Sequence, residues 1–351
     1  MTASVPSRGS WRTGAAKILL VCTPFAMTTL HAAQKPVPAK APVKLDYLLP
    51  RIPPYRSEGP AVPPRFLLEA RPPVTPDRLE AYEVLPSTVD AAFVQRIAAS
   101  FDLKAVPRGP DGDRWELTES GEDPSRRRTL TVYVASGAFS YAVEDLLFAR
   151  ADQQPRLPSE KEAHELAVRS LKERGLLPSD ALIDLQQVHF SRPTLIERSV
   201  KEKKNLKEIV TSIEVRFPRA LDGYRVRGPG AKLYVAIGEG GKVLGVSKVW
   251  RDVTKTGTRL PSIQPEDAIQ LLQQGAGVLD ADPLCEQAQV LRMEVLYWMD
   301  GPKAPQRNVL PVYRVEGRCL SADRKALRDF QAYAPAVLNA PFGGGRGERQ
   351  P

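Results

Sequence analysis

The sequence has little cysteine, little histidine and few aromatic residues. Only 3 of its 351 residues are cysteine, 3 are histidine, and aromatic residues make up 7%. So few cysteines exclude a disulfide-dense scaffold, and so few histidines leave little room for a histidine-rich metal site. With 42% hydrophobic and 26% charged residues, most of the chain is able to bury a core, which excludes disorder throughout. The low aromatic content predicts cores built mainly from aliphatic side chains.

Acidic residues are absent from the first 33 positions. Three basic residues precede an apolar run from Ile18 to Leu30, and small residues follow that run. A basic segment followed by an apolar segment of this length is typical of a secretory signal peptide. We therefore predict a signal peptide over 1–33 and a mature protein that is secreted or periplasmic, with no membrane contact after cleavage.

An uncleaved N-terminal membrane anchor is the alternative. The stretch without charged side chains runs from Ile18 to Gln34, and Pro24 interrupts it. At ~1.5 Å per residue, a stretch of this length is at the lower limit for crossing a hydrocarbon core of ~30 Å. Cleavage is the favoured prediction, and it lowers the formal net charge from +9 to near +6 because three basic residues leave with the signal.

The predicted mature chain keeps two cysteines, Cys285 and Cys319. In an oxidising compartment, two cysteines most simply form one disulfide. Such a disulfide would close a loop whose ends are 34 residues apart, which stabilises a fold by roughly 3–4 kcal/mol. Two buried free thiols are the alternative.

Proline is concentrated near the N-terminus, where 12 of the 33 prolines lie between Pro36 and Pro76. Proline fixes φ and lacks the amide donor that helices and central strands need. We therefore predict a proline-rich extended spacer over 34–79, in which Phe66 to Leu68 is apolar enough to pack on the folded part. The glycine-rich end of the chain predicts a disordered tail over 339–351.

Three segments begin with the signals of a helix. Ser87, Ser159 and Ser262 each precede apolar residues at helical spacing; Glu162 completes a capping box with Ser159, and Pro265 is a suitable first helical residue. Each segment continues into residues typical of strands. We therefore predict an α+β fold of three tandem modules, each with one helix packed on an antiparallel sheet, after the proline-rich spacer. The predicted modules cover 80–150, 155–254 and 258–338.

The second and third modules share strand patterns. Ile213 to Phe217 resembles Met293 to Tyr297, and Tyr234 to Gly238 resembles Tyr313 to Gly317. The two pairs of segments are separated by nearly equal lengths of chain, which indicates an internal repeat. The clearest predicted hairpin runs from Lys232 to Trp250, with glycines in its turn.

The capped helix at Ser159, the strand from Leu233 to Ile237 and the return strand from Gly241 to Leu244 resemble the PepSY and thermolysin-propeptide-like group of exported bacterial proteins. That group has small cystatin-like α+β modules. The resemblance implies a binding, inhibitory or folding-accessory role toward another exported protein, such as a protease, and it implies no catalysis.

Motifs that carry catalytic or metal chemistry are incomplete. The segment from Gly245 to Val249 lacks the second glycine of a nucleophile elbow, and the helix with His164 lacks the second histidine of a zinc protease. Asp111 and Asp113, like Asp280 and Asp282, lack the downstream glutamate of a calcium loop. We therefore predict no catalytic residue, no metal site and no cofactor.

Basic runs occur at Arg126 to Arg128 and at 201–207, but acidic residues flank both runs and no aromatic residues are interleaved for base stacking. We therefore expect no nucleic acid partner. The sequence predicts a secreted, non-enzymatic protein that acts on another exported protein through its sheet faces or an exposed edge strand. The alternatives are an envelope hydrolase with an unrecognised carboxylate site and a membrane-anchored structural spacer.

Overall fold

The computed structural model describes residues 60, 62–120, 127–144, 147, 154–199 and 204–338. The predicted signal peptide or anchor at 1–33, residues 34–59 of the predicted spacer and the predicted tail at 339–351 lie outside the described residues. None of the helices in the described part is both long and apolar enough to cross a membrane.

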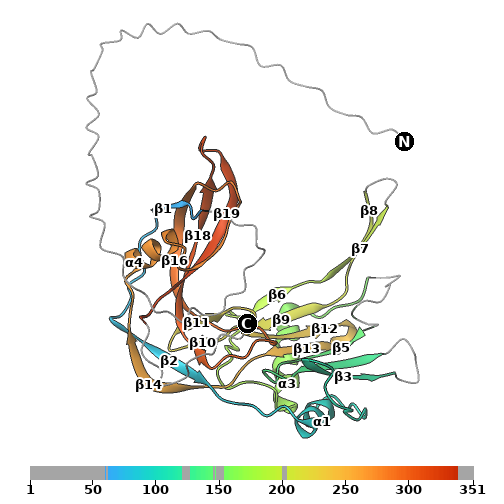
Figure 1. Ribbon diagram of the computed structural model, residues 1–351. Coiled ribbons are helices and arrows are strands. Elements are labelled where there is room, and N and C mark those ends of the chain that lie inside the picture. The colour runs from blue at the N-terminus through green and yellow to red at the C-terminus, as the bar shows by residue number, and fades with distance from the viewer. Residues whose placement is uncertain are drawn as a thin grey trace, which may run out of the picture. The chain divides into compact units, whose positions relative to one another are not determined.

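One seven-stranded antiparallel sheet, the N-terminal sheet, is built from residues between 114 and 249 (Figure 1). Its strands, in spatial order, are β3 (Arg114–Glu119), β4 (Arg128–Tyr133), β5 (Phe139–Val143), β13 (Val243–Val249), β12 (Lys232–Ile237), β9 (Ile213–Phe217) and β6 (His189–Ser191). The turn between β12 and β13 contains the short 3-10 helix η2 (Glu239–Gly241), so the hairpin predicted from Lys232 to Trp250 is confirmed.

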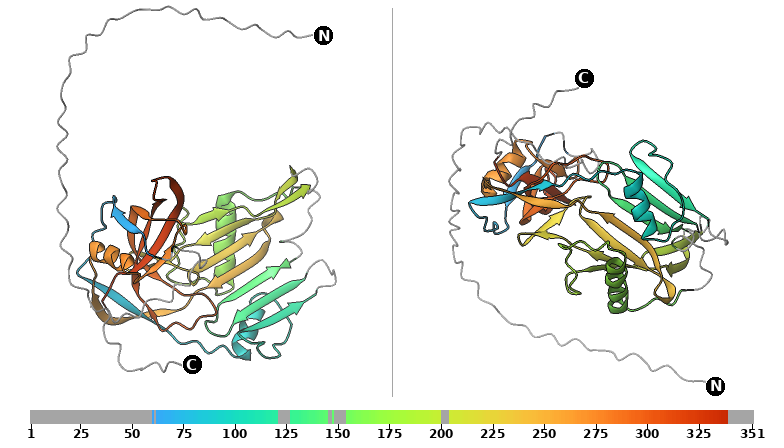
Figure 2. Two further views of the ribbon diagram at one scale, coloured as in Figure 1. Left: turned by 45° about the horizontal axis from the view of Figure 1, so that its top comes forward. Right: turned by 90° about the horizontal axis from the view of Figure 1, so that it is seen from below.

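Helices α1 (Ala91–Ala99) and α3 (Glu160–Glu173) contribute to a single core with the N-terminal sheet (Figure 2). Helix α1 begins after Asp90, whose carboxylate accepts the amide of Phe93 at 2.8 Å. The capping box predicted at Ser159 and Glu162 is present and begins α3. The buried side chains of this core include Val94, Ala98, Ala167, Leu171, Val215, Val235 and Val246.

The second seven-stranded sheet, the C-terminal sheet, is organised around the long strand β16 (Gln287–Trp298). Its other strands are β18 (Pro311–Leu320), β19 (Ala326–Pro335), β15 (Val278–Asp280), β11 (Tyr224–Arg227), β10 (Ala220–Leu221) and β1 (Arg65–Leu68). One edge of β16 pairs with β18, while the other edge pairs in parallel with β1 at its start and with β11 at its end.

Helix α4 (Pro265–Gln273) begins at the predicted Pro265 and shares a core with the C-terminal sheet. Cys285 and Cys319 are joined by a disulfide with a Cα–Cα distance of 5.3 Å, and both side chains are buried in this core. The disulfide connects the segment before β16 to the neighbouring strand β18.

Two smaller sheets complete the described fold. Strand β2 (Arg78–Val84) lies between β14 (Val253–Pro261) and β17 (Asn308–Val309). Strands β7 (Thr194–Ser199) and β8 (Lys204–Val210) form a two-stranded ribbon that extends from β6 and β9, as Figure 1 shows.

The predicted fold class of tandem helix-on-sheet modules is wrong, because the structure is mostly β and its sheets cross the predicted module boundaries. Strand β5, from the first predicted module, pairs with β13, from the second, between Phe139–Ala142 and Gly245–Lys248. The unpaired edge of one small sheet is a ready template for another strand, so the two sheets merge. Strand β1, from the predicted spacer, likewise joins the C-terminal sheet.

The two similar strand patterns form corresponding pairs, but their registers differ by one residue. Strand β9 pairs with β12 so that Ile213 faces Ile237. In the second pattern the residue equivalent to Ile237 is Glu316, but β16 pairs with β18 so that Met293 faces Val315, one residue earlier. A one-residue shift moves side chains to the opposite face of a sheet. Tyr234 is therefore half-buried on the helix-free face, while Tyr313 is fully buried in the core.

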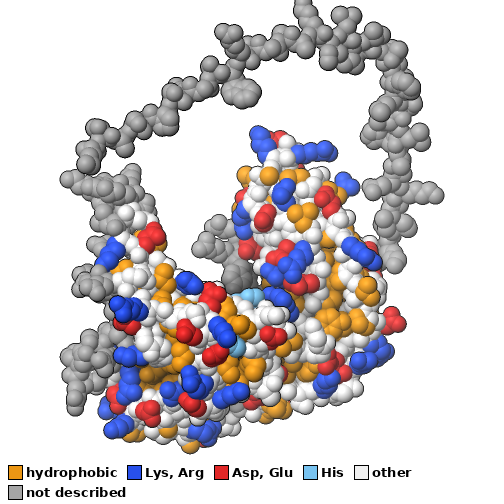
Figure 3. All heavy atoms as spheres, turned by 180° about the vertical axis from the view of Figure 1, so that it is seen from behind, with side chains coloured by type: hydrophobic (Ala, Val, Ile, Leu, Met, Phe, Trp, Pro, Cys, Tyr) orange, Lys and Arg blue, Asp and Glu red, His pale blue; other side chains and the backbone are white. Residues whose placement is uncertain are grey.

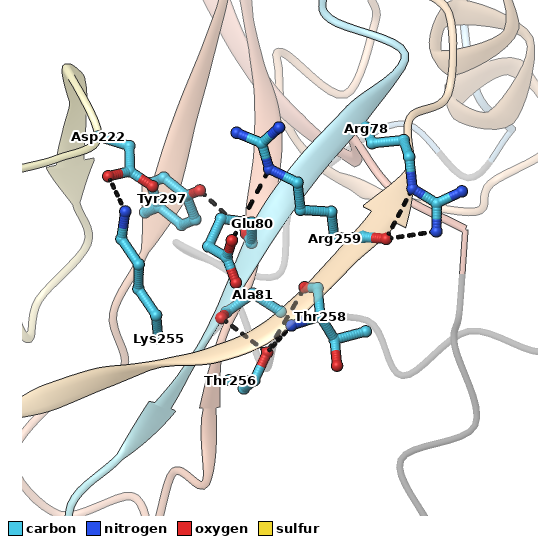
Figure 4. Close-up of polar contacts among 9 residues, drawn as sticks. All are labelled: Arg78, Glu80, Ala81, Asp222, Lys255, Thr256, Thr258, Arg259 and Tyr297. Carbon is cyan, nitrogen blue, oxygen red and sulfur yellow. Dashed lines mark hydrogen bonds and ion pairs between the residues drawn. The ribbon is translucent and has the colours of Figure 1, made fainter.

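The turn between β10 and β11 is attached to β14 and β2 by a polar cluster (Figure 4). Asp222, at φ 49°, lies in this turn, and its Oδ1 is 2.6 Å from Lys255 Nζ on β14. The Tyr82 hydroxyl on β2 also hydrogen-bonds Asp222. The Tyr297 hydroxyl on β16 donates to the carbonyl of Glu80 at 2.9 Å. These contacts link the C-terminal sheet to the three-stranded sheet.

We expect Asp222→Asn to remove a pH-dependent part of this link. Burial raises the pKa of Asp222, but hydrogen bonds from Lys255 and Tyr82 outweigh it and lower that pKa below its ordinary value. The contribution is therefore present above the unfolded pKa of about 4 and is lost as pH falls through the folded pKa. At pH 7 the variant should lose about 1 kcal/mol of unfolding free energy.

Urea titrations at pH 7 and at pH 3 test this prediction. The two proteins should differ at pH 7, and the difference should be smaller at pH 3, because the Asp222 carboxylate becomes protonated as pH falls through its lowered pKa. Asparagine is a suitable replacement because it tolerates positive φ. A difference of the same size at both pH values would show that the ion pair is not responsible.

Candidate functional site

A pocket of about 450 Å³ lies where the N-terminal and C-terminal sheets approach each other. Strands β6, β9 and β12 line it from the N-terminal sheet, and β11 lines it from the C-terminal sheet. Its charged and histidine side chains are His189, Glu214, Arg216, Arg219, Arg225, Arg227 and Lys232. Figure 3 shows blue basic side chains close to pale-blue histidine on this side of the molecule. Five basic residues against one acidic residue make the pocket strongly cationic.

Arg216 is held in place by its neighbours on the helix-free face of the N-terminal sheet. Its Nη2 donates to Oε2 of Glu214 at 2.7 Å, and its Cζ is 5.9 Å from the ring centroid of Tyr234. The same Glu214 oxygen accepts the hydroxyl of Ser191 at 2.8 Å. Glu214 is the only carboxylate in the lining, and its charge is already matched by Arg216.

Arg219 forms the deepest part of the lining, with only 1% of its surface exposed. Its Nε and Nη2 each lie 2.6 Å from Oδ2 of Asp180, while the indole N–H of Trp250 donates to Oδ1 of that carboxylate at 3.0 Å. Burial lowers the pKa of Arg219, and the Asp180 carboxylate opposes that effect. The charge of Arg219 is therefore compensated without any ligand.

Arg225 and Arg227 lie two residues apart on β11, so both project from the same face of this strand. Arg227 is half-buried, and its Nε is buried without a hydrogen-bond partner. Burial lowers the pKa of Arg227, and repulsion from Arg314 and Arg225 lowers it further. Arg225 is exposed and forms no ion pair within the described segments. These two guanidinium groups are available to a ligand.

Close backbone packing fixes β11 beside the pocket. Gly228, at φ 101°, and Gly230 follow β11, and a Cβ atom at these positions would overlap the carbonyl oxygens of Met299 and Asp300, respectively. Only glycine allows this approach. The loop therefore holds Arg227 opposite Trp298 at the end of β16.

The other residues singled out from the sequence lie elsewhere. His164 is 2.8 Å from the carbonyl oxygen of Ile183 through Nε2, whereas His189 lines the pocket. Asp113 pairs with Lys303 at 2.9 Å, and Asp280 pairs with Arg328 at 2.9 Å.

The two basic runs are only partly described. Arg128 pairs with Glu119, whereas Arg126 and residues 201–203 lie outside the described residues. Across the part of the chain that the structure describes, no three His, Cys, Asp or Glu side chains come together in a way that could hold a metal ion.

Sequence reasoning missed the basic residues of the pocket because they do not form a run. A signal was nevertheless present: in Tyr224 to Arg227, basic and apolar residues alternate, which on a strand gathers the basic side chains on one face. Arg216 alternates with apolar neighbours in the same way. Only the pairing of distant strands brings these positions together.

Comparisons with known proteins add little to this geometry. No family model and no curated protein matches the chain. Among solved structures, an uncharacterized protein from Eubacterium rectale is similar, with a TM-score of 0.44 and 11% identity, over 77% of this chain and 87% of that chain. The resemblance to the PepSY group therefore stays a prediction.

Proposed function

We propose that this chain is a secreted or periplasmic, non-enzymatic binding protein that takes an anionic part of another exported protein into its cationic pocket. The excess of basic residues in the pocket carries this proposal, above all Arg225, Arg227 and Lys232, which form no ion pair among the described residues. An anion would relieve the repulsion among Arg225, Arg227 and Arg314. Binding, inhibition or folding assistance of an exported partner all fit a site of this kind.

The location outside the cytosol is supported by the disulfide between Cys285 and Cys319, since such bonds persist in oxidising compartments. The predicted signal peptide points the same way. An acidic segment of an exported protein is therefore the ligand that we expect the pocket to meet.

A labelled hexaglutamate peptide tests the proposal by fluorescence anisotropy with the exported protein. We expect binding that weakens as salt rises from 0.05 to 0.5 M, because the Debye length then falls well below ~10 Å. Lys232→Glu, in the pocket, should weaken binding about tenfold. The matched control is Lys242→Glu, an exposed lysine on the η2 side of the same sheet that is not part of the pocket.

Equal losses in the two variants would show that general surface charge, and not the pocket, binds the peptide. Absence of any salt-sensitive binding would overturn the proposal altogether.

A further inference from the structure

Arg225 and Arg227, the two arginines available to a ligand, are spaced at the repeat distance of side chains on one face of a strand. Arg225 and Arg227 are two residues apart on β11, and residues two apart on a strand are separated by ~6.6–6.8 Å along the chain. Both side chains line the pocket. The pocket therefore presents two positive charges in a row at the repeat distance of an extended polypeptide.

An extended peptide presents its own side chains with the same repeat. Residues i and i+2 of such a peptide lie on one side and are separated by the same distance. Carboxylates at these two positions could therefore meet Arg225 and Arg227 at the same time, whereas adjacent carboxylates point to opposite sides.

We propose that the ligand of the pocket is an extended acidic peptide segment with carboxylates two residues apart, which Arg225 and Arg227 bind one each. This inference rests on the proposed function and specifies its ligand. Arg227 is the anchor, because it is half-buried in the pocket lining and its two Nη groups can form a two-point contact with a carboxylate. Arg225, which is exposed, binds the second carboxylate more weakly.

The remaining basic residues have other roles. Glu214 and Asp180 already compensate the charges of Arg216 and Arg219, so these two guanidinium groups are not available to a ligand carboxylate. Lys232 is exposed and attracts the segment as a point charge. Both the two-point contact and the spacing of the two charges come from residues of β11.

Two isomeric peptides test the inference by isothermal titration calorimetry: capped Ser-Glu-Ser-Glu-Ser and capped Ser-Glu-Glu-Ser-Ser. They have the same composition and net charge and differ only in the spacing of their carboxylates. We expect the alternating peptide to bind about fivefold tighter, the value of one additional exposed ion pair.

Arg225→Gln removes the second positive charge, so it should abolish the preference between the isomers. The matched variant Arg225→Lys should keep most of the preference, because a point charge serves the exposed position. Arg227→Lys keeps the charge and removes the two-point contact, so it should weaken the binding of both isomers. Thermal unfolding followed by circular dichroism verifies that the variants are folded.

Equal affinities for the two isomers, with binding still reduced by Lys232→Glu, would overturn the spacing inference and leave the proposed function standing. Binding of inorganic polyphosphate with no binding of either peptide would overturn both, since it would indicate a phosphate polymer. Unchanged affinity of both isomers for Arg227→Lys would refute the role of Arg227 as the anchor.

Discussion

Replacing Asp180 by alanine should lower the free energy of unfolding by about 3–5 kcal/mol, because the replacement leaves a buried guanidinium without its counterion. Asp180 accepts one hydrogen bond from Arg219 Nε and one from Trp250, and its Oδ2 also lies 2.6 Å from Arg219 Nη2 in an ion pair. Arg219 is almost completely buried, and its Cζ lies 4.9 Å from the ring centroid of Trp250.

The effect should extend to the junction of the two sheets. Arg219 Nη1 donates to the carbonyl of Arg251 at 2.8 Å and lies 3.4 Å from Met299 Sδ. Arg251 in turn donates to the carbonyls of Asp300, Gly301 and Ala304 beyond the end of β16. The Asp180 carboxylate therefore supports a chain of contacts from the loop after α3 to the C-terminal sheet.

Urea unfolding of three proteins tests this prediction: the parent, Asp180→Ala, and Asp180→Ala combined with Arg219→Met. The double variant should be more stable than the single variant, because it no longer buries a charge. It should remain below the parent, since the Arg251 carbonyl loses its donor. A single variant within about 1 kcal/mol of the parent would contradict the prediction.

Removing the disulfide should lower the free energy of unfolding by roughly 3–4 kcal/mol, chiefly by releasing the unfolded chain from a loop whose ends are 34 positions apart. The folded state itself loses few contacts when the disulfide is removed, because β16 and β18 still pair along most of their length. Alanine is the suitable replacement, since both sulfur atoms lie in an apolar core.

Urea unfolding of the oxidised parent and of Cys285→Ala with Cys319→Ala measures this contribution. The parent treated with a reductant provides the control, and it should unfold near the double variant. Equal stabilities of oxidised parent and variant would exclude a stabilising disulfide, as would two free thiols in the denatured, unreduced protein.

Local features of the fold were predictable from sequence because their physical causes are local. Ser159 and Glu162 satisfy each other's amides within one helical turn, and the glycines after Ile237 reverse the chain within a few residues. Pro265 begins α4 for the same kind of reason, since its missing amide is not needed there.

The assembly of the sheets was not predictable, because it depends on pairs that are distant in sequence. Nothing in Phe139–Val143 specifies that its partner is β13, which lies far along the chain beyond α3 and β12. Tyr234 and Tyr313 begin similar five-residue patterns, yet one lies on the surface of a sheet and the other in a core. A single residue of register, set by strands on either side, makes that difference.

The candidate site was less predictable still. The described residues of the two basic runs are not part of the pocket lining, whereas Arg216, Arg225 and Arg227 are single residues among apolar neighbours. Their alternation was visible in the sequence. Their convergence depends on β11 leaving the neighbourhood of β9 to pair with β16.

The pairing of β1 with β16 delays the burial of β1 during synthesis of the chain. Arg65 on β1 pairs with Gln287, so most of the described chain is synthesised between the two partners. At a synthesis rate of ~5–20 residues per second, the partner strand is made roughly 10–45 s after β1. During that interval Phe66 has no sheet in which to be buried, so β1 stays exposed to proteases and to chaperones until β16 has been synthesised.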